Sequence, residues 1–317
     1  MRAAESTQAP VDLSCNPAYV EERRLLVDWV CELAAEFRLQ PNTAHVAVVY
    51  MDGFVSSNTG TFPHNGYFRL LAIACLSLAC KYQEPEEILP SMDRLLGHLP
   101  EGTHPRIVHL MEVEVIRQRA WCLSTTTPLQ YVGLHVARGV VFEGDKWLVR
   151  REALRSCGYI SRFSTFFVEL CTQEAEFLSF TPSLIAAATI VATRRAQLIS
   201  PMWTPQLEPV LGYSWAQVRP VFVALWSRYA RDFGEQAKSV DRTWRDEYSA
   251  MGSSPVSALG SAASPGTSVM PLLGEGGQTS LLQALPSTPI APGKGLPASR
   301  PMPNFTHDNI PGPPVLP

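Results

Sequence analysis

The stretch from Arg69 to Glu84 constrains the fold more than any other part of the chain. Its leucines and isoleucine alternate with alanines and cysteines, so that nearly every side of the predicted helix is apolar or small. Small residues at this density let neighbouring helices approach closely on several faces, which is typical of a helix at the centre of a bundle. The apolar run covers about 11 residues, roughly half of what a bilayer crossing requires, so no membrane span is predicted here.

Amphipathic patterns on both sides of this stretch predict further helices and no sheet. Apolar residues recur at helical spacing, and no segment has the strict alternation of a half-buried strand. In the first half the predicted helices are Pro17–Phe37, Thr43–Ser56, Arg69–Glu84, Ile88–His98 and Pro105–Arg119. In the second half they are Leu129–Arg138, Arg150–Phe177, Ser183–Arg195, Trp203–Gly212 and a helix capped by Ser214. The predicted apolar stripe of the fifth helix consists of Ile107, Leu110, Met111 and Val115.

The segment Ser183–Arg195 repeats the plan of the central stretch. It has the same mixture of small and branched residues, a similar apolar length and the same charged ending. Such a recurrence predicts the internal duplication of a helical unit. We therefore predict an all-α fold of two tandem five-helix bundles, with residues 17–127 in the first bundle and residues 128–240 in the second.

Both ends of the chain lack the pattern of a folded core. Residues 1–16 have no charged start followed by an apolar run, so we predict a flexible N-terminus and no secretory signal. After Ala250 the chain holds 13 of its 27 prolines and 9 of its 20 glycines but only four charged residues. Because this composition cannot bury enough apolar surface, we predict a disordered Pro/Ser/Gly-rich tail over residues 241–317.

Charge, cysteine usage and the absence of catalytic motifs exclude several classes of function. A net charge of -3 lacks the basic footprint of a nucleic-acid-binding protein. The seven cysteines contain no CxxC pair and mostly fall within apolar helical patterns, which predicts reduced thiols in a reducing compartment. There is no P-loop, HExxH or GxSxG motif, and the histidines have no ligand-like spacing. We therefore expect no catalytic residue, metal site or cofactor.

Several motifs, in order along the chain, resemble those of the cyclin family, whose fold is two successive five-helix cyclin boxes. RRLLVDWV at Arg23–Val30 is similar to the family's MRAILVDWL, YMDGF at Tyr50–Phe54 to YIDRF, and LACKYQE at Leu78–Glu84 to LASKFEE. FLSFTPSLIAAA at Phe177–Ala188 is similar to the family's YLxYxPSxIAAAA. The resemblance covers roughly Pro17–Ala230, and the segments EEILPSMDRLL and ISPMWTPQLEPVLGYSW are similar to cyclin J and cyclin J-like proteins.

The resemblance implies a protein without chemistry of its own, a regulatory subunit that binds and activates a cyclin-dependent serine/threonine kinase in cell-cycle control. Lys81 and Glu112 match the pair that hydrogen-bonds the kinase backbone near its mobile C helix. Leu70 matches a buried interface leucine, while Arg23 and Asp52 match an internal ion pair that fixes the first two helices. From the residues alone, Lys81 and Glu112 are solvated surface charges.

Departures from the family pattern bear on substrate docking. Many cyclins receive short Arg-x-Leu substrate motifs on a patch of the first helix, of which this chain retains Leu26 and Trp29. Glu22 stands at a methionine position of the patch, and Arg69 stands at a glutamine position that helps to bind the motif. Leu26 and Trp29 therefore serve either the docking patch or the core alone. In addition, Gly53 replaces the arginine of the YIDRF pattern.

The predicted tail holds three candidate phosphorylation sites. Ser254, Ser264 and Thr288 each precede a proline, as proline-directed sites do. The alternative is that such dipeptides arise by chance in a Ser/Pro-rich coil.

A second class of function is also open, namely a transcription-related cyclin-fold scaffold that binds proteins without activating a kinase. The Lys81 and Glu112 pair distinguishes the two, because kinase binding needs it and a scaffold does not. The family implies residence in the nucleus, the cytoplasm or both, and the expected partners include neither nucleic acid nor a membrane.

Overall fold

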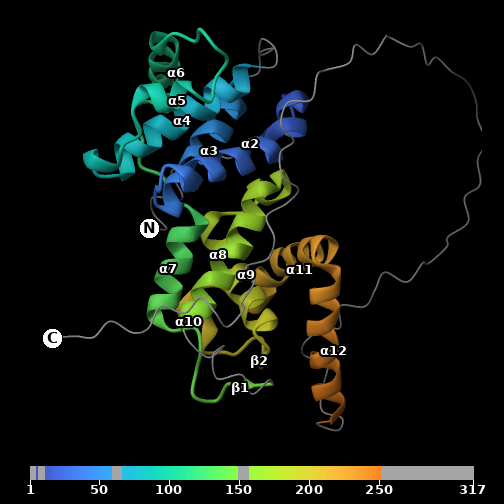
Figure 1. Ribbon diagram of the computed structural model, residues 1–317. Helices are drawn as coiled ribbons and strands as arrows, with labels where there is room; N and C mark the ends of the chain where they lie inside the picture. Colours follow the sequence, from blue (N-terminus) through green and yellow to red (C-terminus); the bar gives the residue numbers. More distant parts are fainter. Residues whose placement is uncertain (1–4, 6–10, 59–65, 149–156, 251–317) are drawn as a thin grey trace, which may run out of the picture. The chain divides into compact units, whose positions relative to one another are not determined.

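Figure 1 shows the computed structural model, which describes residues 5, 11–58, 66–148 and 157–250. All of these residues belong to one compact unit, residues 1–255. The described part is helical almost throughout and forms two successive bundles, which confirms the predicted all-α fold class. Leu13 and Asn16, which were predicted to be flexible, are buried, and the Asn16 side chain donates to the Val55 carbonyl at 3.1 Å. That part of the prediction for the N-terminus is wrong.

Helix α4 (Tyr67–Gln83) forms the centre of the first bundle. Every residue from Leu71 to Cys80 is buried, because its large side chains point in several directions and its small ones admit neighbouring helices. The helices that pack around it are α2 (Pro17–Glu36), α3 (Pro41–Ser57) and α6 (Pro105–Gln118). The central stretch of the sequence is therefore the centre of a bundle.

The segment between α4 and α6 differs from the predicted helix Ile88–His98. It consists of a 3-10 turn, η1 (Glu86–Ile88), and a short helix, α5 (Met92–Leu96). Pro90 separates the two because it lacks a backbone N–H and disfavours a helical conformation in the residue before it. A continuous helix was the wrong prediction for this segment.

Helix α9 (Pro182–Ala196) has the corresponding central position in the second bundle. Its residues from Ile185 to Arg194 are all buried. The helices that pack against it are α7 (Pro128–Arg138), α8 (Cys157–Gln173) and α11 (Trp215–Asp232). The two apolar stretches that suggested a duplication thus have the same place in their bundles.

Three details of the second bundle correct the sequence-based predictions. Helix α8 ends at Gln173, and a 3-10 segment, η3 (Ala175–Ser179), follows it where a continuous helix was predicted. Helix α10 (Leu207–Leu211) is shorter than predicted. Strands β1 (Lys146–Trp147) and β2 (Ile199–Ser200) form an antiparallel pair, although no strand was predicted. A strand of only two residues is too short to show the alternation of apolar and polar residues from which strands are predicted.

Helix α12 (Gly234–Ala250) extends ten residues into the region predicted to be the tail. Its Trp244 is buried and donates its indole N–H to the Arg195 carbonyl at 3.0 Å, while Asp241 accepts from the Arg195 guanidinium at 2.8 Å. The same guanidinium lies 4.5 Å from the centre of the Trp226 ring. The prediction that the tail begins at residue 241 is therefore wrong, and its remainder, residues 251–317, lies outside the described residues.

Candidate functional site

The structure brings together Lys81, in the last turn of α4, and Glu112, in the middle of α6. The Lys81 ammonium lies 2.7 Å from Oε1 and 2.8 Å from Oε2 of the Glu112 carboxylate. The Lys81 side chain is 45% exposed and the Glu112 side chain only 8%. Although burial alone would raise the pKa of Glu112, hydrogen bonds from Lys81, Ser77 and His109 outweigh it and lower that pKa. The carboxylate is thus a fixed anchor for an accessible cation.

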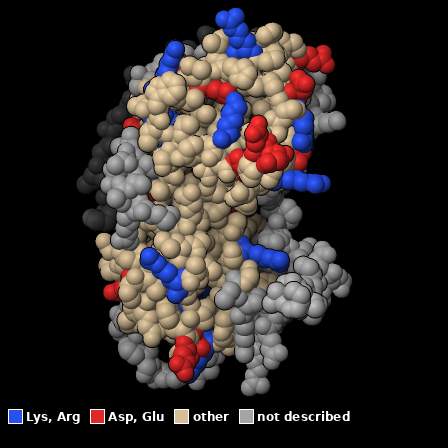
Figure 2. Space-filling model, turned by 90° about the vertical axis from the view of Figure 1, so that its left-hand side faces the viewer, with Lys and Arg blue, Asp and Glu red and all other residues tan. Residues whose placement is uncertain are grey.

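Apolar side chains are exposed on the two helices that carry this pair and on the turn that follows α4. They are Tyr82, next to Lys81 in the chain, Ile88 in η1 and Val113, next to Glu112. Leu70, the fourth residue of α4, is half-buried and packs against the core of the first bundle. On the face shown in Figure 2, charged side chains gather over the first bundle beside broad uncharged areas. A combination of this kind suits binding to another protein.

Helix α6 is itself apolar on two sides. Val108 and Val115 are buried against the core, whereas Ile107 and Leu110, which were predicted to belong to the core stripe, are exposed. The helical period alone does not reveal this, because apolar residues occur around most of the helix.

Arg23 and Asp52 form a buried bidentate ion pair between α2 and α3. Nε and Nη2 of Arg23 each lie 2.8 Å from a carboxylate oxygen of Asp52, and both side chains are 2% exposed. Tyr19 donates its hydroxyl to the same carboxylate at 2.7 Å. Nη1 of Arg23 donates to the Thr172 carbonyl of α8 at 3.0 Å, so this guanidinium also ties the first bundle to the second. The pair has a structural role.

The residues of the predicted docking patch have different surroundings. Leu26 is buried in the core, whereas Trp29 is only partly buried. The guanidinium of Arg69 lies over the Trp29 ring, 5.5 Å from its centre. Of the two interpretations left open by the sequence, the core position is the one that the burial of Leu26 supports.

Arg194 lies near the end of α9, where the duplicated unit places the counterpart of Lys81. It is fully buried, and its Nη1 and Nη2 each lie 2.7 Å from an oxygen of Asp145. It also donates to the backbone carbonyls of Val140, Pro201 and Met202. All of these contacts are internal, so the second bundle does not present this cation to a partner.

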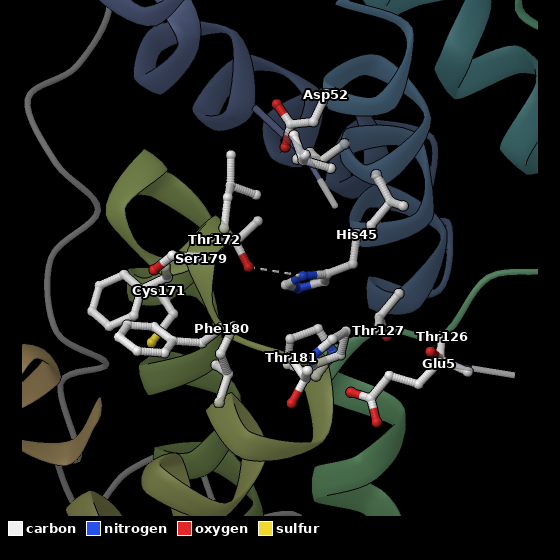
Figure 3. A pocket seen from close by; sticks show the side chains of 18 of the residues that line it. Glu5, His45, Asp52, Thr126, Thr127, Cys171, Thr172, Ser179, Phe180 and Thr181 are labelled. Carbon is white, nitrogen blue, oxygen red and sulfur yellow. Dashed lines mark hydrogen bonds between the residues drawn. The ribbon is translucent and has the colours of Figure 1, made fainter. Parts of the chain in front are cut away.

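A cavity of about 280 Å³ lies where the two bundles meet (Figure 3). His45 of α3 and Thr172 of α8 face each other in it, with 3.2 Å between Nδ1 and Oγ1. The Thr172 hydroxyl donates its proton to the Val168 carbonyl at 2.8 Å, so His45 is the donor to Thr172. Burial also lowers the pKa of His45 to about 4. A histidine that donates to the hydroxyl cannot activate it as a nucleophile.

At the edge of this cavity, Glu5 contacts the start of α9. Its carboxylate accepts from the backbone N–H and from the hydroxyl of Ser183, both at 2.7 Å. A carboxylate is favourable at the N-terminus of a helix, where backbone N–H groups lack partners within the helix. The contact therefore stabilises the second bundle.

Three of the sequence-based expectations concern metal binding, membrane insertion and phosphorylation. Within residues 5, 11–58, 66–148 and 157–250, no group of three acidic, histidine or cysteine side chains could hold a metal ion. No helix in the same ranges is long and apolar enough to cross a membrane. The candidate phosphorylation sites Ser254, Ser264 and Thr288 lie outside the described residues.

Sequence reasoning missed Trp121, which lies in the turn at the end of α6. Its side chain is 75% exposed, and its backbone has a left-handed conformation with φ of 64°. Neither feature has a signal in the sequence, because a tryptophan after a helical pattern is equally compatible with a core position.

The fold first places the chain in a class, that of all-helical proteins with two tandem bundles, each of which is built around one central apolar helix. Residues 2–124 match the family model "Cyclin, N-terminal domain", and residues 148–257 match "Cyclin, C-terminal domain". The chain therefore belongs to the cyclin family. Cyclins are regulatory proteins and not themselves enzymes.

Individual proteins with a similar sequence agree with this assignment. The chain is 30% identical over 217 residues to "Cyclin-D" of Ostreococcus tauri, covering 64% of this chain and 55% of that protein. It is 26% identical over 225 residues to "Cyclin-J" of Xenopus laevis, covering 68% and 57%. The predicted resemblance to cyclin J is thereby confirmed. The chain spans a little over half the length of these curated relatives.

One solved structure, that of a viral cyclin from herpesvirus saimiri, is also similar. It has 14% sequence identity and a TM-score of 0.49, and the match covers 72% of this chain and 91% of that chain.

Proposed function

We propose that this chain is a regulatory subunit that binds and activates a cyclin-dependent serine/threonine kinase, in the setting of cell-cycle control. The observation that carries the proposal is the exposed Lys81 ammonium, held in place by the nearly buried Glu112 carboxylate. An internal ion pair of this geometry keeps the lysine in one conformation before a partner arrives. Less side-chain freedom is then lost on binding.

The chemistry of the pair suits a kinase backbone. An ammonium group has three N–H donors, and two of those of Lys81 are directed at the Glu112 oxygens. The third is left for an acceptor of the partner, such as a backbone carbonyl at the kinase C helix. Tyr82, Ile88 and Val113 supply exposed apolar surface that this helix would cover.

Activation would follow from the position of the C helix. A kinase is active when the glutamate of this helix pairs with the lysine that positions the nucleotide and when the activation loop is ordered. A cyclin surface that binds the helix only in its inward position shifts the kinase toward that state, because the ligand stabilises the state that it binds better.

The test measures binding and peptide phosphorylation with a panel of monomeric cyclin-dependent kinases and the full chain. The variant Lys81→Ala/Glu112→Ala removes both charges, so neither is left unpaired. The matched control is Lys238→Ala/Glu235→Ala, which removes a lysine–glutamate pair of α12 with 2.9 Å between Nζ and Oε1. We expect the wild type and the control to stimulate a kinase equally and the Lys81/Glu112 variant to lose at least about tenfold in affinity.

Two outcomes would contradict the proposal. If no kinase of the panel binds a folded, helical wild-type chain, activation is excluded and the scaffold function takes its place. If a kinase binds and the Lys81/Glu112 variant activates it as well as the control does, this pair is not the binding site.

A further inference from the structure

The cavity at the junction of the two bundles contains a buried hydrogen-bond acceptor without a donor. Figure 3 shows the His45 imidazole projecting from α3 into this space, toward Thr172 of α8. Because Nδ1 donates to the Thr172 hydroxyl, the lone pair of the neutral ring belongs to Nε2. His45 is only 4% exposed, and none of the described residues donates to its Nε2. A buried acceptor in this state costs free energy that a ligand with a donor would recover.

Other polar groups that line the cavity already have partners inside the protein. Arg23 and Asp52 pair with each other. The Glu5 carboxylate accepts from Ser183, and the Thr127 hydroxyl donates to the side chain of Asn42 at 2.6 Å. A ligand gains little from groups that are already engaged, so Nε2 of His45 is the atom that would orient it.

Much of the remaining lining is apolar, and part of it is aromatic. Val48 and Val49 come from α3, Ile185 from α9, and Phe177 and Phe180 from η3 and the residue after it. The two phenylalanine rings lie 6.4 Å apart between their centres and are inclined by 50°. Rings placed at an angle can contact both a face and an edge of a third ring, an arrangement that aromatic groups favour.

The size of the cavity indicates how large a ligand it holds. An apolar cavity of about 150 Å³ in a protein core binds benzene. The junction cavity has about 280 Å³, which is room for two fused rings. Ser179 and Thr181 line it and are exposed, while Phe180 between them is half-buried, so this side of the cavity is open to solvent.

The charges around the cavity favour a neutral ligand. An anion would approach the lone pair of His45 and the carboxylates of Glu5 and Asp52, which repel it. A cation would lose its hydration in a mostly apolar space, and both carboxylates already accept hydrogen bonds within the protein. Burial also lowers the pKa of His45 to about 4, so the imidazole is itself neutral near pH 7.

We propose that the junction cavity binds a small neutral aromatic molecule of two fused rings, whose single N–H or O–H group donates to Nε2 of His45. The inference does not depend on the proposed function, because neither Lys81 nor Glu112 lines this cavity. The ligand would contact α3 of the first bundle and α9 of the second at the same time. It would therefore stabilise the folded chain in proportion to its occupancy.

The experiment measures binding of indole and of indene to the full chain by titration calorimetry near pH 7. Indene has the same two fused rings but no N–H group, and it is the more apolar of the two. We expect indole to bind one site with a dissociation constant below about 1 mM. Indene should bind at least about fivefold more weakly, because it makes no hydrogen bond with Nε2. If burial of apolar surface alone decided binding, indene would bind more tightly.

His45→Asn tests the acceptor. The asparagine amide can still donate to Thr172 but has no atom in place of Nε2. In this variant indole should lose about fivefold in affinity and bind no better than indene. The matched control is His98→Asn, because His98 is partly buried and does not line the cavity. It should leave both affinities unchanged. Circular dichroism checks that both variants remain helical, and the NMR signal of the Nε2 nitrogen in the wild type should shift with indole but not with indene.

Four outcomes would overturn the proposal. The first is that indole does not bind the folded wild type at millimolar concentration. The second is that indene binds as tightly as indole, and the third is that His45→Asn keeps the full preference for indole. The fourth is that N-acetyltryptophanamide binds as tightly as indole, which would assign the cavity to a tryptophan side chain of a peptide and not to a free small molecule.

Discussion

Replacing Asp52 by alanine should destabilise this cyclin more than almost any other single change. The substitution removes the carboxylate that accepts two N–H groups of Arg23 and the hydroxyl of Tyr19. The guanidinium that remains is 2% exposed and keeps only the Thr172 carbonyl as a partner. It is then a buried charge that has lost its hydrogen-bonded counter-ion.

The magnitude follows from that stranded charge. Removing one partner of a buried ion pair costs about 3–5 kcal/mol in the free energy of unfolding, which is a large share of the stability of a typical domain. In the double variant Arg23→Met/Asp52→Ala no charge is left behind. Its cost should therefore be smaller than that of Asp52→Ala alone, although it contains one more substitution.

The assay is urea unfolding followed by circular dichroism, with the free energy obtained by linear extrapolation. The control is Arg24→Ala, at the neighbouring residue of the same helix. Arg24 is 40% exposed, and its nitrogens lie 3.8 Å from Glu174 and 3.6 Å from Asp232. An exposed pair of this kind contributes at most about 1 kcal/mol. A loss below about 1 kcal/mol for Asp52→Ala, or a double variant less stable than the single one, would refute the reasoning.

Three further predictions concern the bundle junction and the second bundle. Because burial lowers the pKa of His45 from 6.5 to about 4, its contribution to stability is complete above pH 6.5 and is lost as the pH falls toward 4, by about 3 kcal/mol. His45→Asn should flatten the pH dependence of the urea midpoint in this range. If the midpoint of the variant changes with pH as steeply as that of the wild type, His45 is not the source of the pH dependence. Asp145→Ala removes the carboxylate that pairs with the buried Arg194 and should lower the free energy of unfolding by about 3–5 kcal/mol in the same urea assay. A loss below about 1 kcal/mol would mean that the backbone carbonyls around Arg194 are enough to stabilise its buried charge. Trp244→Ala should lower stability by about 3 kcal/mol in calorimetric unfolding, and no effect would mean that α12 is not part of the folded unit.

The sequence identified the parts of the fold that depend on local periodicity. The apolar residues of α4 and α9 surround their helices, so these helices have to be central whatever the rest of the chain does. Helix α12 was not predicted, because its composition is polar and it contributes few apolar residues to the core. Trp244 reveals its role only when it is seen against α9 and α11.

For the candidate site, too, the sequence predicted the residues and only the tertiary packing decided their contacts. The resemblance pointed to Lys81 and Glu112, yet their separation of 31 residues says nothing about a contact, which only the packing of α4 against α6 creates. The exposure of Leu110 and the burial of Leu26 were not readable either, because apolar residues occur on more than one side of α6 and α2. Burial depends on which neighbours cover a side, and those neighbours come from distant parts of the chain.

By itself, the sequence determined the helical class, the two central helices and the family, because periodicity, composition and short motifs are properties of neighbouring residues. The tertiary structure decided which charges meet. It buries Arg194 with Asp145 but leaves Lys81 half exposed on Glu112, although both cations stand near the end of a central helix. It also fixes Trp121 in solvent on a turn that Arg119 and Tyr50 support. These outcomes depend on long-range packing, which sets the local exposure of each charge and ring.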